Sequence, residues 1–426
     1  MAQDDIVTPD QSIPDTTPAA TAFQTLSPAE RKTFWASFGG YALDGMDFQL
    51  YGFVIPTLLT VWSMSRSEAG VIATVAILAS AFGGWIGGIM ADRFGRAITL
   101  QITIAWFSLF TGLSGLTNSP EQLMIMRALH GLGFGAEWAV GAALLSEIVS
   151  ANHRGRLLGF VQSSWAVGWA AALISYTVTF HFLDDATAWR VLFFIGLAPA
   201  LFIVFVRRHV RDSRVFVETR QHSEQGGIAR LFSPEIVRTT LLTAVLGTGV
   251  HGGYYGVMIW LPTYLKTERN LSVLSTSGYL VVIILASFIG YISAALFLDR
   301  FGRRKTFLIF SAGATLTVIL YTLVPISNSL MLVLGFPLGF FAAGVSSGCG
   351  AYFAELFPTA VRASGMGFAY NFGRAMGAVF PTLVGILSSH ILLGAAIGIF
   401  TTCAYALIWC SLAFLPETKG RVIAAA

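Results

Sequence analysis

Long apolar stretches, separated by short polar segments, follow one another along almost the whole chain. A bilayer core about 30 Å thick is crossed by about 20 mainly apolar residues of helix, and each stretch reaches that length. The pattern therefore predicts an all-α polytopic membrane protein with twelve spans. They lie near residues 34–61, 68–91, 97–117, 121–146, 157–182, 188–207, 239–265, 274–298, 305–325, 329–354, 363–390 and 392–415.

Three polar segments flank or divide these spans. Residues 1–33 are rich in Asp, Pro, Thr and Ala and lack the basic and apolar parts of a signal peptide, so we expect a disordered tail. Residues 208–238 are basic and predict a linker, and residues 416–426 a C-terminal tail. We expect one six-helix lobe over residues 34–207 and a second over residues 239–415.

Two motifs indicate that the halves arose by duplication. The segment ADRFGR at residues 91–96 recurs as LDRFGR at residues 298–303, an offset of 207. An acid followed seven residues later by an arginine occurs at Glu147–Arg154 and again at Glu355–Arg362, an offset of 208. Two motifs at nearly one offset predict a parallel repeat of two lobes.

Composition and charge exclude an ordinary soluble domain. Charged residues make up 11% of the chain, against about 25% in soluble proteins. The net charge of +4 could indicate nucleic-acid binding, but the basic residues lie in loops between the spans, so no nucleic-acid partner is expected. Twenty Lys and Arg residues fall on the side that holds both termini and four on the other. The positive-inside rule therefore predicts cytoplasmic termini. The expected location is the plasma membrane, which in bacteria is the inner membrane.

The loop between the second and third spans carries a specific motif. It reads Gly88-x-x-x-Asp92-Arg93-x-Gly95-Arg96. With it, the chain from about Phe34 to Gly420 resembles the major facilitator superfamily. The resemblance implies the fold of that superfamily and transport by alternating access.

Further segments resemble particular groups within the superfamily. DGMD at residues 44–47, RALHGLGFGAEWAVG at 127–141 and ELFPTAVRASGMGFAYNFGR at 355–374 are similar to those of aromatic acid and sialate or monocarboxylate proton symporters. PETKG at 416–420 is shared more widely with sugar porters. These segments imply secondary transport of an organic acid, and several cargoes fit them.

Ionisable residues inside the spans are costly in lipid and are candidates for proton coupling. Asp44 and Asp47 lie close to the midplane, three residues apart, and two such carboxylates would not both ionise easily. Glu137 and Arg127 share one stripe of the fourth span, and Arg127 resembles the arginine of a superfamily motif associated with proton coupling. His130, on the same stripe, is expected to be a packing residue. The alternative for each acid is a fixed pair with a basic group.

Arg374 is the candidate for holding the cargo. It lies near the middle of the eleventh span, and Ala166 stands at the equivalent position of the first half. A guanidinium binds a carboxylate through two parallel hydrogen bonds. The alternative is a fixed salt bridge to one of the buried acids. Further residues expected to complete the pocket are Asn371, Gln49, Gln162, Trp165, His251, Tyr254 and Tyr255.

Charged and glycine residues of the loop motifs are expected to form a cytoplasmic gate that stabilises the outward-open state. Their ion pairs would lie across the two lobes or at helix termini. The predicted gate residues are Gly88, Asp92, Arg93, Gly95, Arg96, Glu147, Arg154, Asp299, Arg303, Glu355 and Arg362.

The favoured function is proton-coupled symport of a small organic anion, such as an aromatic acid, lactate or sialic acid, by a monomer in the lipid bilayer. Rival functions are a proton-coupled sugar porter, an exporter of drugs or metabolites, and a sensor without net transport. Neither an HExxH nor a GxxxxGK[ST] motif occurs, so we predict no enzyme, no cofactor and no metal.

Overall fold

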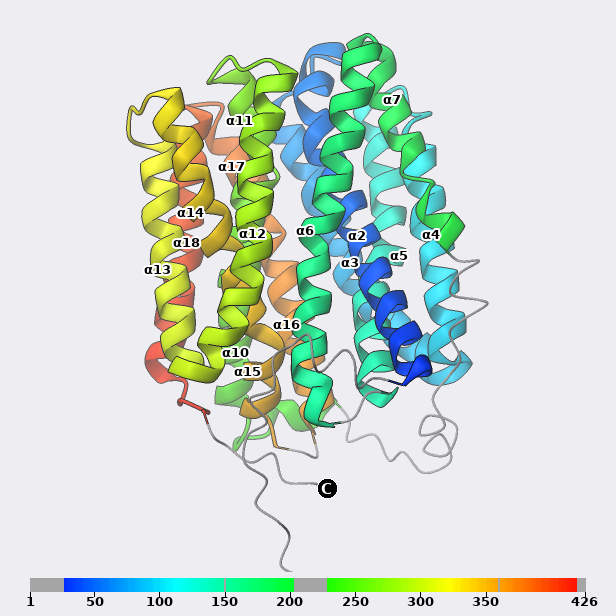
Figure 1. The fold of residues 1–426 in the computed structure, drawn as a ribbon, viewed down its shortest axis with the longest axis vertical. Helices are drawn as coiled ribbons and strands as arrows, with labels where there is room; N and C mark the ends of the chain where they lie inside the picture. The colour runs from blue at the N-terminus through cyan, green and yellow to red at the C-terminus, as the bar shows by residue number, and fades with distance from the viewer. Residues whose placement is uncertain (1–26, 149–150, 203–227, 359–360, 420–426) are drawn as a thin grey trace, which may run out of the picture.

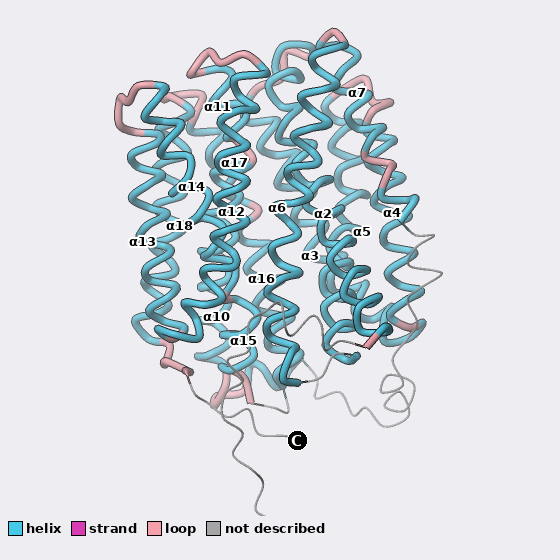
Figure 2. Tube along the Cα trace, in the orientation of Figure 1, coloured by secondary structure: helices cyan, strands magenta, loops and turns pink. Residues whose placement is uncertain are grey.

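The computed structural model describes residues 27–148, 151–202, 228–358 and 361–419. These residues form long helices packed side by side, and no strand occurs among them (Figure 1, Figure 2). In chain order the helices are α2 (Pro28–Val61), α3 (Arg66–Phe94), α4 (Arg96–Ser114), α5 (Pro120–Ile148), α6 (Ala151–Phe182), α7 (Asp185–Ile195), the short 3₁₀ helix η1 (Ile228–Phe232), α10 (Val237–Met258), α11 (Leu261–Thr267), α12 (Val273–Phe301), α13 (Arg303–Thr322), α14 (Asn328–Ser347), α15 (Cys349–Leu356), α16 (Arg362–Gly377), α17 (Val379–Leu387) and α18 (Leu393–Phe414).

Seven of the described segments are long and apolar enough to cross a membrane by length and composition alone. They are Arg66–Ala91, Ala97–Ser114, Asp185–Phe202, Val273–Phe301, Arg303–Thr322, Asn328–Leu356 and Leu393–Phe414. Other predicted spans coincide with α2, α5 and α6, which are as long but carry more polar residues. The buried acids belong to α2 and α5, and polar side chains of this kind lower the mean hydropathy.

The first helix begins earlier than predicted. Ser27 accepts a hydrogen bond from the Glu30 backbone N–H, and the Glu30 carboxylate accepts one from the Ser27 N–H. This capping box, with Pro28 in the first turn, starts α2 at residue 28 rather than 34. The last residues of the predicted tail, 28–33, are therefore helical, and residues 1–26 lie outside the described part.

Three predicted spans of the second half are each broken into two helices. α10 ends at Met258, four residues before Pro262, and α16 ends at Gly377, four residues before Pro381. A proline cannot donate to the carbonyl four residues earlier and its ring clashes there, which favours a break at each of these positions. Pro56 and Pro337 lie inside α2 and α14, which continue through them. The third break, between α14 and α15, is at Gly348.

The turns between α3 and α4 and between α12 and α13 have the same backbone conformation. Gly95 has φ 103° and Gly302 has φ 90°, values that glycine adopts without strain. These glycines stand at equivalent positions of the two copies of the loop motif. The backbone therefore repeats along with the sequence.

The helices form two six-helix lobes. In the first, α5 packs on α3 and α4, and α6 packs on α2; in the second, α10 packs on α16 and α18, and α12 on α14. The lobes meet where α6 contacts α12 and where α3 contacts α16 and α17. The interface between the lobes thus includes α3 and α6 of the first lobe and α12, α16 and α17 of the second.

Hydrogen bonds hold the lobes together near the end of the bundle that lies opposite the start of α2 and the end of α18 (Figure 1). The Thr74 hydroxyl contacts the Thr382 hydroxyl at 2.7 Å and donates to the Ala378 carbonyl at 2.5 Å. The Thr177 and Ser277 hydroxyls are 2.6 Å apart. The lobes are therefore joined at this end.

Replacing Gly135 with alanine should destabilise the first lobe. A Cβ at this position would lie 1.6 Å from the Ser80 carbonyl oxygen, so α3 and α5 would have to separate. Overpacking of this kind costs about 1 to 3 kcal/mol, and the melting temperature in detergent should fall. Gly278→Ala is the control, since its Cβ would meet nothing within 4 Å. Equal melting temperatures for the two variants would contradict the described α3–α5 contact.

Candidate functional site

An aromatic cavity of about 40 Å³ lies between the lobes. This space holds only a few water molecules, so an organic acid can enter only if the lobes move apart. The residues that line it are Tyr41, Gln162, Trp165, Val250, His251, Tyr254, Tyr255, Tyr291, Ser346, Cys349, Tyr370 and Arg374. We call it the cargo cavity. Arg374 supplies the one positively charged side chain among these lining residues.

Arg374 is buried without a counter-ion at close range. Its side chain is 5% exposed, its guanidinium carbon lies 4.9 Å from the centre of the Phe134 ring, and the Tyr255 hydroxyl is within hydrogen-bonding reach. Among the residues that the structure describes, no carboxylate forms an ion pair with Arg374. Its Nε–H has no hydrogen-bond partner. A buried donor without an acceptor is costly, so this position favours binding of an anion.

Two of the predicted proton-coupling acids form a buried pair beside Arg374. Asp44 and Glu137 are each 1% exposed, and their carboxyl groups lie within hydrogen-bonding reach of each other. Gly40 makes room for this pair, because a Cβ there would lie 2.1 Å from Glu137 Oε1. Arg374 acts electrostatically on Asp44. The acid pair and the cargo arginine are therefore neighbours.

Asp47 belongs to a separate cluster. It accepts a hydrogen bond of 2.5 Å from the Thr111 hydroxyl, and its other oxygen contacts His130 Nε2. Arg127 acts electrostatically on Asp47 and stacks over the Tyr51 ring at 5.8 Å. Asp44 and Asp47 therefore have different hydrogen-bond partners, although Asp47 acts electrostatically on Asp44.

His130 was expected to be a packing residue, and the structure gives it a polar partner in Asp47. Its position on the stripe that carries Arg127 and Glu137 is the feature of the sequence that indicates a polar role. Nothing in the sequence marks Thr111 as the other partner of Asp47, because hydroxyl residues are common in these helices.

Aromatic residues of the cargo cavity connect the two lobes. Trp165 Nε1 donates to the Tyr254 hydroxyl at 2.7 Å, which joins α6 to α10. His251 Nδ1 lies 2.9 Å from the Gly247 carbonyl, and its ring meets the Tyr370 ring edge-on at 4.8 Å. The predicted pocket residues Gln162, Trp165, His251, Tyr254 and Tyr255 all line this cavity.

Two predicted pocket residues lie elsewhere. Gln49 is buried, its Nε2 has no hydrogen-bond partner, and it does not line the cargo cavity. Asn371 donates to the Gly367 carbonyl at 3.0 Å and faces Gly84 of α3. Conversely, Tyr41, Tyr291, Tyr370 and Cys349 line the cavity but were not singled out in the sequence.

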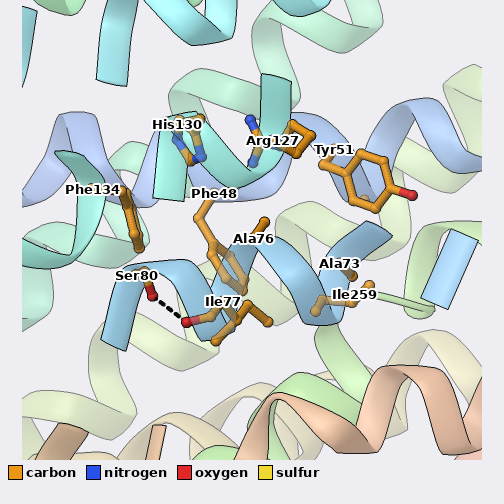
Figure 3. Close-up of a pocket in the computed structure, with 11 residues that line it drawn as sticks. Phe48, Tyr51, Ala73, Ala76, Ile77, Ser80, Arg127, His130, Phe134 and Ile259 are labelled. Carbon is orange, nitrogen blue, oxygen red and sulfur yellow. Dashed lines mark hydrogen bonds between the residues drawn. The ribbon is translucent and has the colours of Figure 1, made fainter. Parts of the chain in front are cut away.

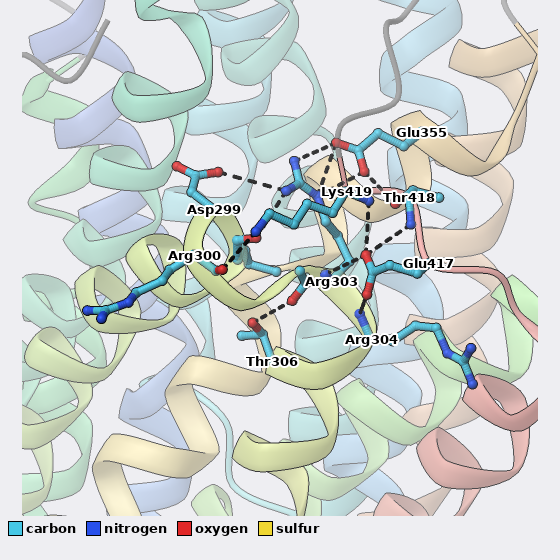
Figure 4. A network of polar contacts seen from close by, with 11 residues as sticks. Asp299, Arg300, Arg303, Arg304, Thr306, Glu355, Glu417, Thr418 and Lys419 are labelled. Carbon is cyan, nitrogen blue, oxygen red and sulfur yellow. Dashed lines mark hydrogen bonds and ion pairs between the residues drawn. The ribbon is translucent and has the colours of Figure 1, made fainter. Parts of the chain in front are cut away.

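The second copy of the loop motif forms a network within the second lobe (Figure 4). Arg303 pairs with Glu355 at 2.6 Å and more distantly with Asp299 at 3.9 Å. The Thr418 hydroxyl also donates to Glu355, at 2.5 Å. These contacts join helix ends of one lobe. The side chains of the corresponding residues of the first copy, Asp92, Arg96, Glu147 and Arg154, lie outside the described part.

The chain after α18 is bound to the same network. Glu417 accepts hydrogen bonds from the backbone N–H groups of Arg303 and Arg304, at the start of α13, and Lys419 Nζ donates to the Arg300 carbonyl. Burial alone would raise the pKa of Glu417, but backbone hydrogen bonds outweigh it and hold the pKa below its ordinary value. The segment thus caps α13 with a negative charge.

The other predicted gate residues make local contacts. Arg93 stacks over Phe94 at 5.6 Å, and Arg362 donates to the Ala354 carbonyl at 2.9 Å. A Cβ at Gly88 would meet no atom within 4 Å, so packing does not explain this glycine.

Comparison with known proteins agrees with this architecture. The sequence matches the Major Facilitator Superfamily over residues 37–297 and the Sugar (and other) transporter family over residues 250–425. A probable 4-methylmuconolactone transporter of Cupriavidus pinatubonensis is 43% identical over 93% of both chains. The cis,cis-muconate transport protein of Acinetobacter baylyi is 30% identical over 86% of this chain and 88% of its own. The inward-open xylose transporter of E. coli superposes with a TM-score of 0.71 at 20% identity, covering 92% of this chain and 98% of that one.

Proposed function

Because the chain belongs to the major facilitator superfamily of membrane transporters, we propose that it carries a small unsaturated or aromatic organic acid together with protons. The observation that carries this proposal is Arg374, a buried guanidinium in an aromatic cavity with no carboxylate paired to it among the described residues. A planar acid would place its carboxylate on Arg374 and its conjugated body against the aromatic side chains. The named relatives, which are transport proteins for muconolactone and muconate, support this class of cargo.

The Asp44–Glu137 pair is the proposed proton carrier. Two carboxyl groups can hydrogen-bond to each other only when one of them holds a proton. Asp44 also lies in the field of Arg374, so a cargo carboxylate and Asp44 compete for the same positive charge. When cargo neutralises Arg374, protonation of the acid pair becomes more favourable, and cargo and proton then move together.

The Asp47–His130 pair is a second group that can hold a proton, and Arg127 influences its charge. We retain Asp47 and Arg127 in the proposed coupling machinery. His130 lies on the same stripe of α5 as Glu137, seven residues away, so the two proton-holding groups lie at different heights along this helix.

We propose that both termini are cytoplasmic, that residues 208–238 link the lobes on that side, and that the protein lies in the bacterial inner membrane. With this orientation, the hydrogen bonds of Thr74 and Thr177 close the outer end of the cargo cavity. Breaking them opens the cavity to the outside, and the charged network around Arg303 lies at the cytoplasmic ends of the helices. Rocking of the two lobes would then give alternating access.

Uptake into liposomes tests this function. Purified protein in vesicles with an alkaline interior should accumulate labelled cis,cis-muconate above its outside concentration, and a protonophore should abolish the accumulation. Vesicles without protein measure passive entry of the neutral acid, and labelled xylose tests for a sugar porter. Accumulation of xylose in place of the acid, or of the acid equally with the protonophore, would refute the proposal. Absence of any flux would favour a sensor.

A further inference from the structure

A second, smaller cavity is lined mainly by residues of the first lobe (Figure 3). Its volume is about 20 Å³, room for one polar head group or one to two water molecules. Residues of α2, α3 and α5 line it, with Ile259 from the second lobe. Its charged side chain is Arg127, and His130 stands next to it. We call it the Arg127 cavity.

Buried donors at this cavity lack acceptors. Arg127 is 3% exposed, and its Nε and Nη1 have no hydrogen-bond partner. His130 Nδ1 also has no partner, and it donates only when the imidazole is protonated. The oxygens of Asp47 are directed to Thr111 and His130 Nε2, and neither accepts a hydrogen bond from Arg127 Nε or Nη1. No ion pair of Arg127 occurs among the residues that the structure describes. Leaving several buried donors unpaired is costly, so an acceptor is expected here.

Neighbouring polar groups of the cavity are already bonded elsewhere. The Tyr51 hydroxyl points away from Arg127 and donates to the Ala69 carbonyl at 2.8 Å (Figure 3). The Ser80 hydroxyl donates to the Ile77 carbonyl at 2.7 Å. Neither hydroxyl accepts a hydrogen bond from Arg127 Nε or Nη1, so water or a ligand group in the cavity would be their acceptor.

Two aromatic side chains of the Arg127 cavity contact residues that line the cargo cavity. Phe134 lines the Arg127 cavity, and Arg374 stacks against the same ring at 4.9 Å. Phe48 also lines it and packs against Trp165 and Tyr255 of the cargo cavity, with ring centres 5.4 and 5.5 Å away. A ligand body between these rings would reach both cavities.

The two arginines are spaced for a short linear ligand. Arg127 and Phe134 are seven residues apart on α5, about 10 Å along the helix axis, and Arg374 lies at the level of Phe134. A linear six-carbon diacid, counted with one hydrogen bond at each carboxylate, is about as long as this separation along α5. A carboxylate also supplies the negative charge and the two acceptor oxygens that the unpaired N–H groups require.

We propose that Arg127 and His130 form a second carboxylate subsite, so that the preferred cargo is a linear unsaturated diacid held by Arg374 at one end and Arg127 at the other. Phe48 and Phe134 flank its conjugated middle. This inference rests on the proposed function, because it takes Arg374 as the first anchor.

Equilibrium binding of two matched acids tests the second subsite. The probes are trans,trans-hexa-2,4-dienedioate and trans,trans-hexa-2,4-dienoate, which differ only by a carboxylate in place of a methyl group, with the monomethyl ester of the diacid as a size control. Affinities are measured by calorimetry on the full chain in detergent at neutral pH. The wild type should bind the diacid about tenfold or more tightly than the monoacid or the ester, the gain of one charged hydrogen-bonded contact.

The variants assign this preference to Arg127. In Arg127→Gln the ratio of the two affinities should fall to about threefold or less. The control is Lys266→Gln, which removes a positive charge in the last turn of α11 that is paired with Asp185. It should keep the wild-type ratio. Arg127→Lys replaces the glutamine variant if that one does not fold. A wild type without preference for the diacid, or a glutamine variant that keeps it, overturns the second subsite and leaves the cavity to water. If the wild type binds neither acid, the proposed function itself fails.

Discussion

Lysine in place of Arg374 should weaken binding of the cargo by about 10- to 150-fold, the loss of one hydrogen bond to a charged group. Lysine keeps the positive charge but cannot offer a carboxylate two parallel N–H groups. The ammonium would also lose the flat stacking of the guanidinium on Phe134. The fold should be retained, because no described carboxylate depends on Arg374 as an ion-pair partner.

The measurement is the affinity for the acid and the melting temperature of Arg374→Lys and Arg374→Ala in detergent. Arg190→Lys is a matched control, because Arg190 is bonded to the Gly115 and Thr117 carbonyls at 2.9 and 2.8 Å, far along the chain from the cargo cavity residues. Its affinity for the acid should equal that of the wild type. Unchanged affinity together with a lowered melting temperature for the Arg374 variants would make Arg374 a structural residue and remove it from the cargo site.

Neutralising the buried acids should abolish accumulation of cargo while leaving exchange partly intact. Asp44→Asn and Glu137→Gln keep the size of the side chains but remove the proton that passes between the carboxyl groups. Without a titrating group, the pH gradient can no longer drive uptake, so the ratio of inside to outside cargo should fall to about one. Counterflow exchange needs no net proton movement and should continue. Asp47→Asn tests the second proton-holding group in the same way.

The assay compares accumulation and counterflow in the same proteoliposomes. Glu121→Gln serves as the control on α5, because Glu121 is an exposed carboxyl in the first turn of the helix that carries Glu137. It should accumulate cargo as the wild type does. If all three buried-acid variants still accumulated cargo against its gradient, proton coupling through these residues would be excluded.

Hydropathy and charge placement were enough to predict the helical bundle and its two lobes, because a span needs only length and apolar composition. The exact ends and breaks of the helices depend on local backbone chemistry, which the hydropathy pattern does not show. The breaks after Met258 and Gly377 depend on single prolines four residues later, and the apolar runs continue through them. The start of α2 at Pro28 depends on the Ser27 cap, which precedes the apolar run.

The separation of Asp44 from Asp47 shows why spacing alone does not give a site. Three residues of helix turn the chain so that the two side chains point about 60° apart. That angle directs Asp44 towards Glu137 of α5 and Asp47 towards Thr111 of α4 and His130 of α5. Which neighbour stands at each angle is a property of helix packing. For the same reason Tyr291 and Tyr370 were not predicted to line the cargo cavity, because the apolar pattern of a span does not show which face of the helix points into a cavity.

The two lobes contribute unequally to the site, and this has a consequence for how such proteins diversify. The buried acids Asp44, Asp47 and Glu137 all belong to the first lobe, whereas most of the cargo cavity wall, with Arg374, belongs to the second. Ala166, the counterpart of Arg374, remains a small apolar residue. Under the proposed function, the first copy supplies energy conversion and the second supplies molecular recognition. Substitutions in the second lobe would therefore change which compounds are transported and leave the proton-coupling residues of the first lobe unaltered.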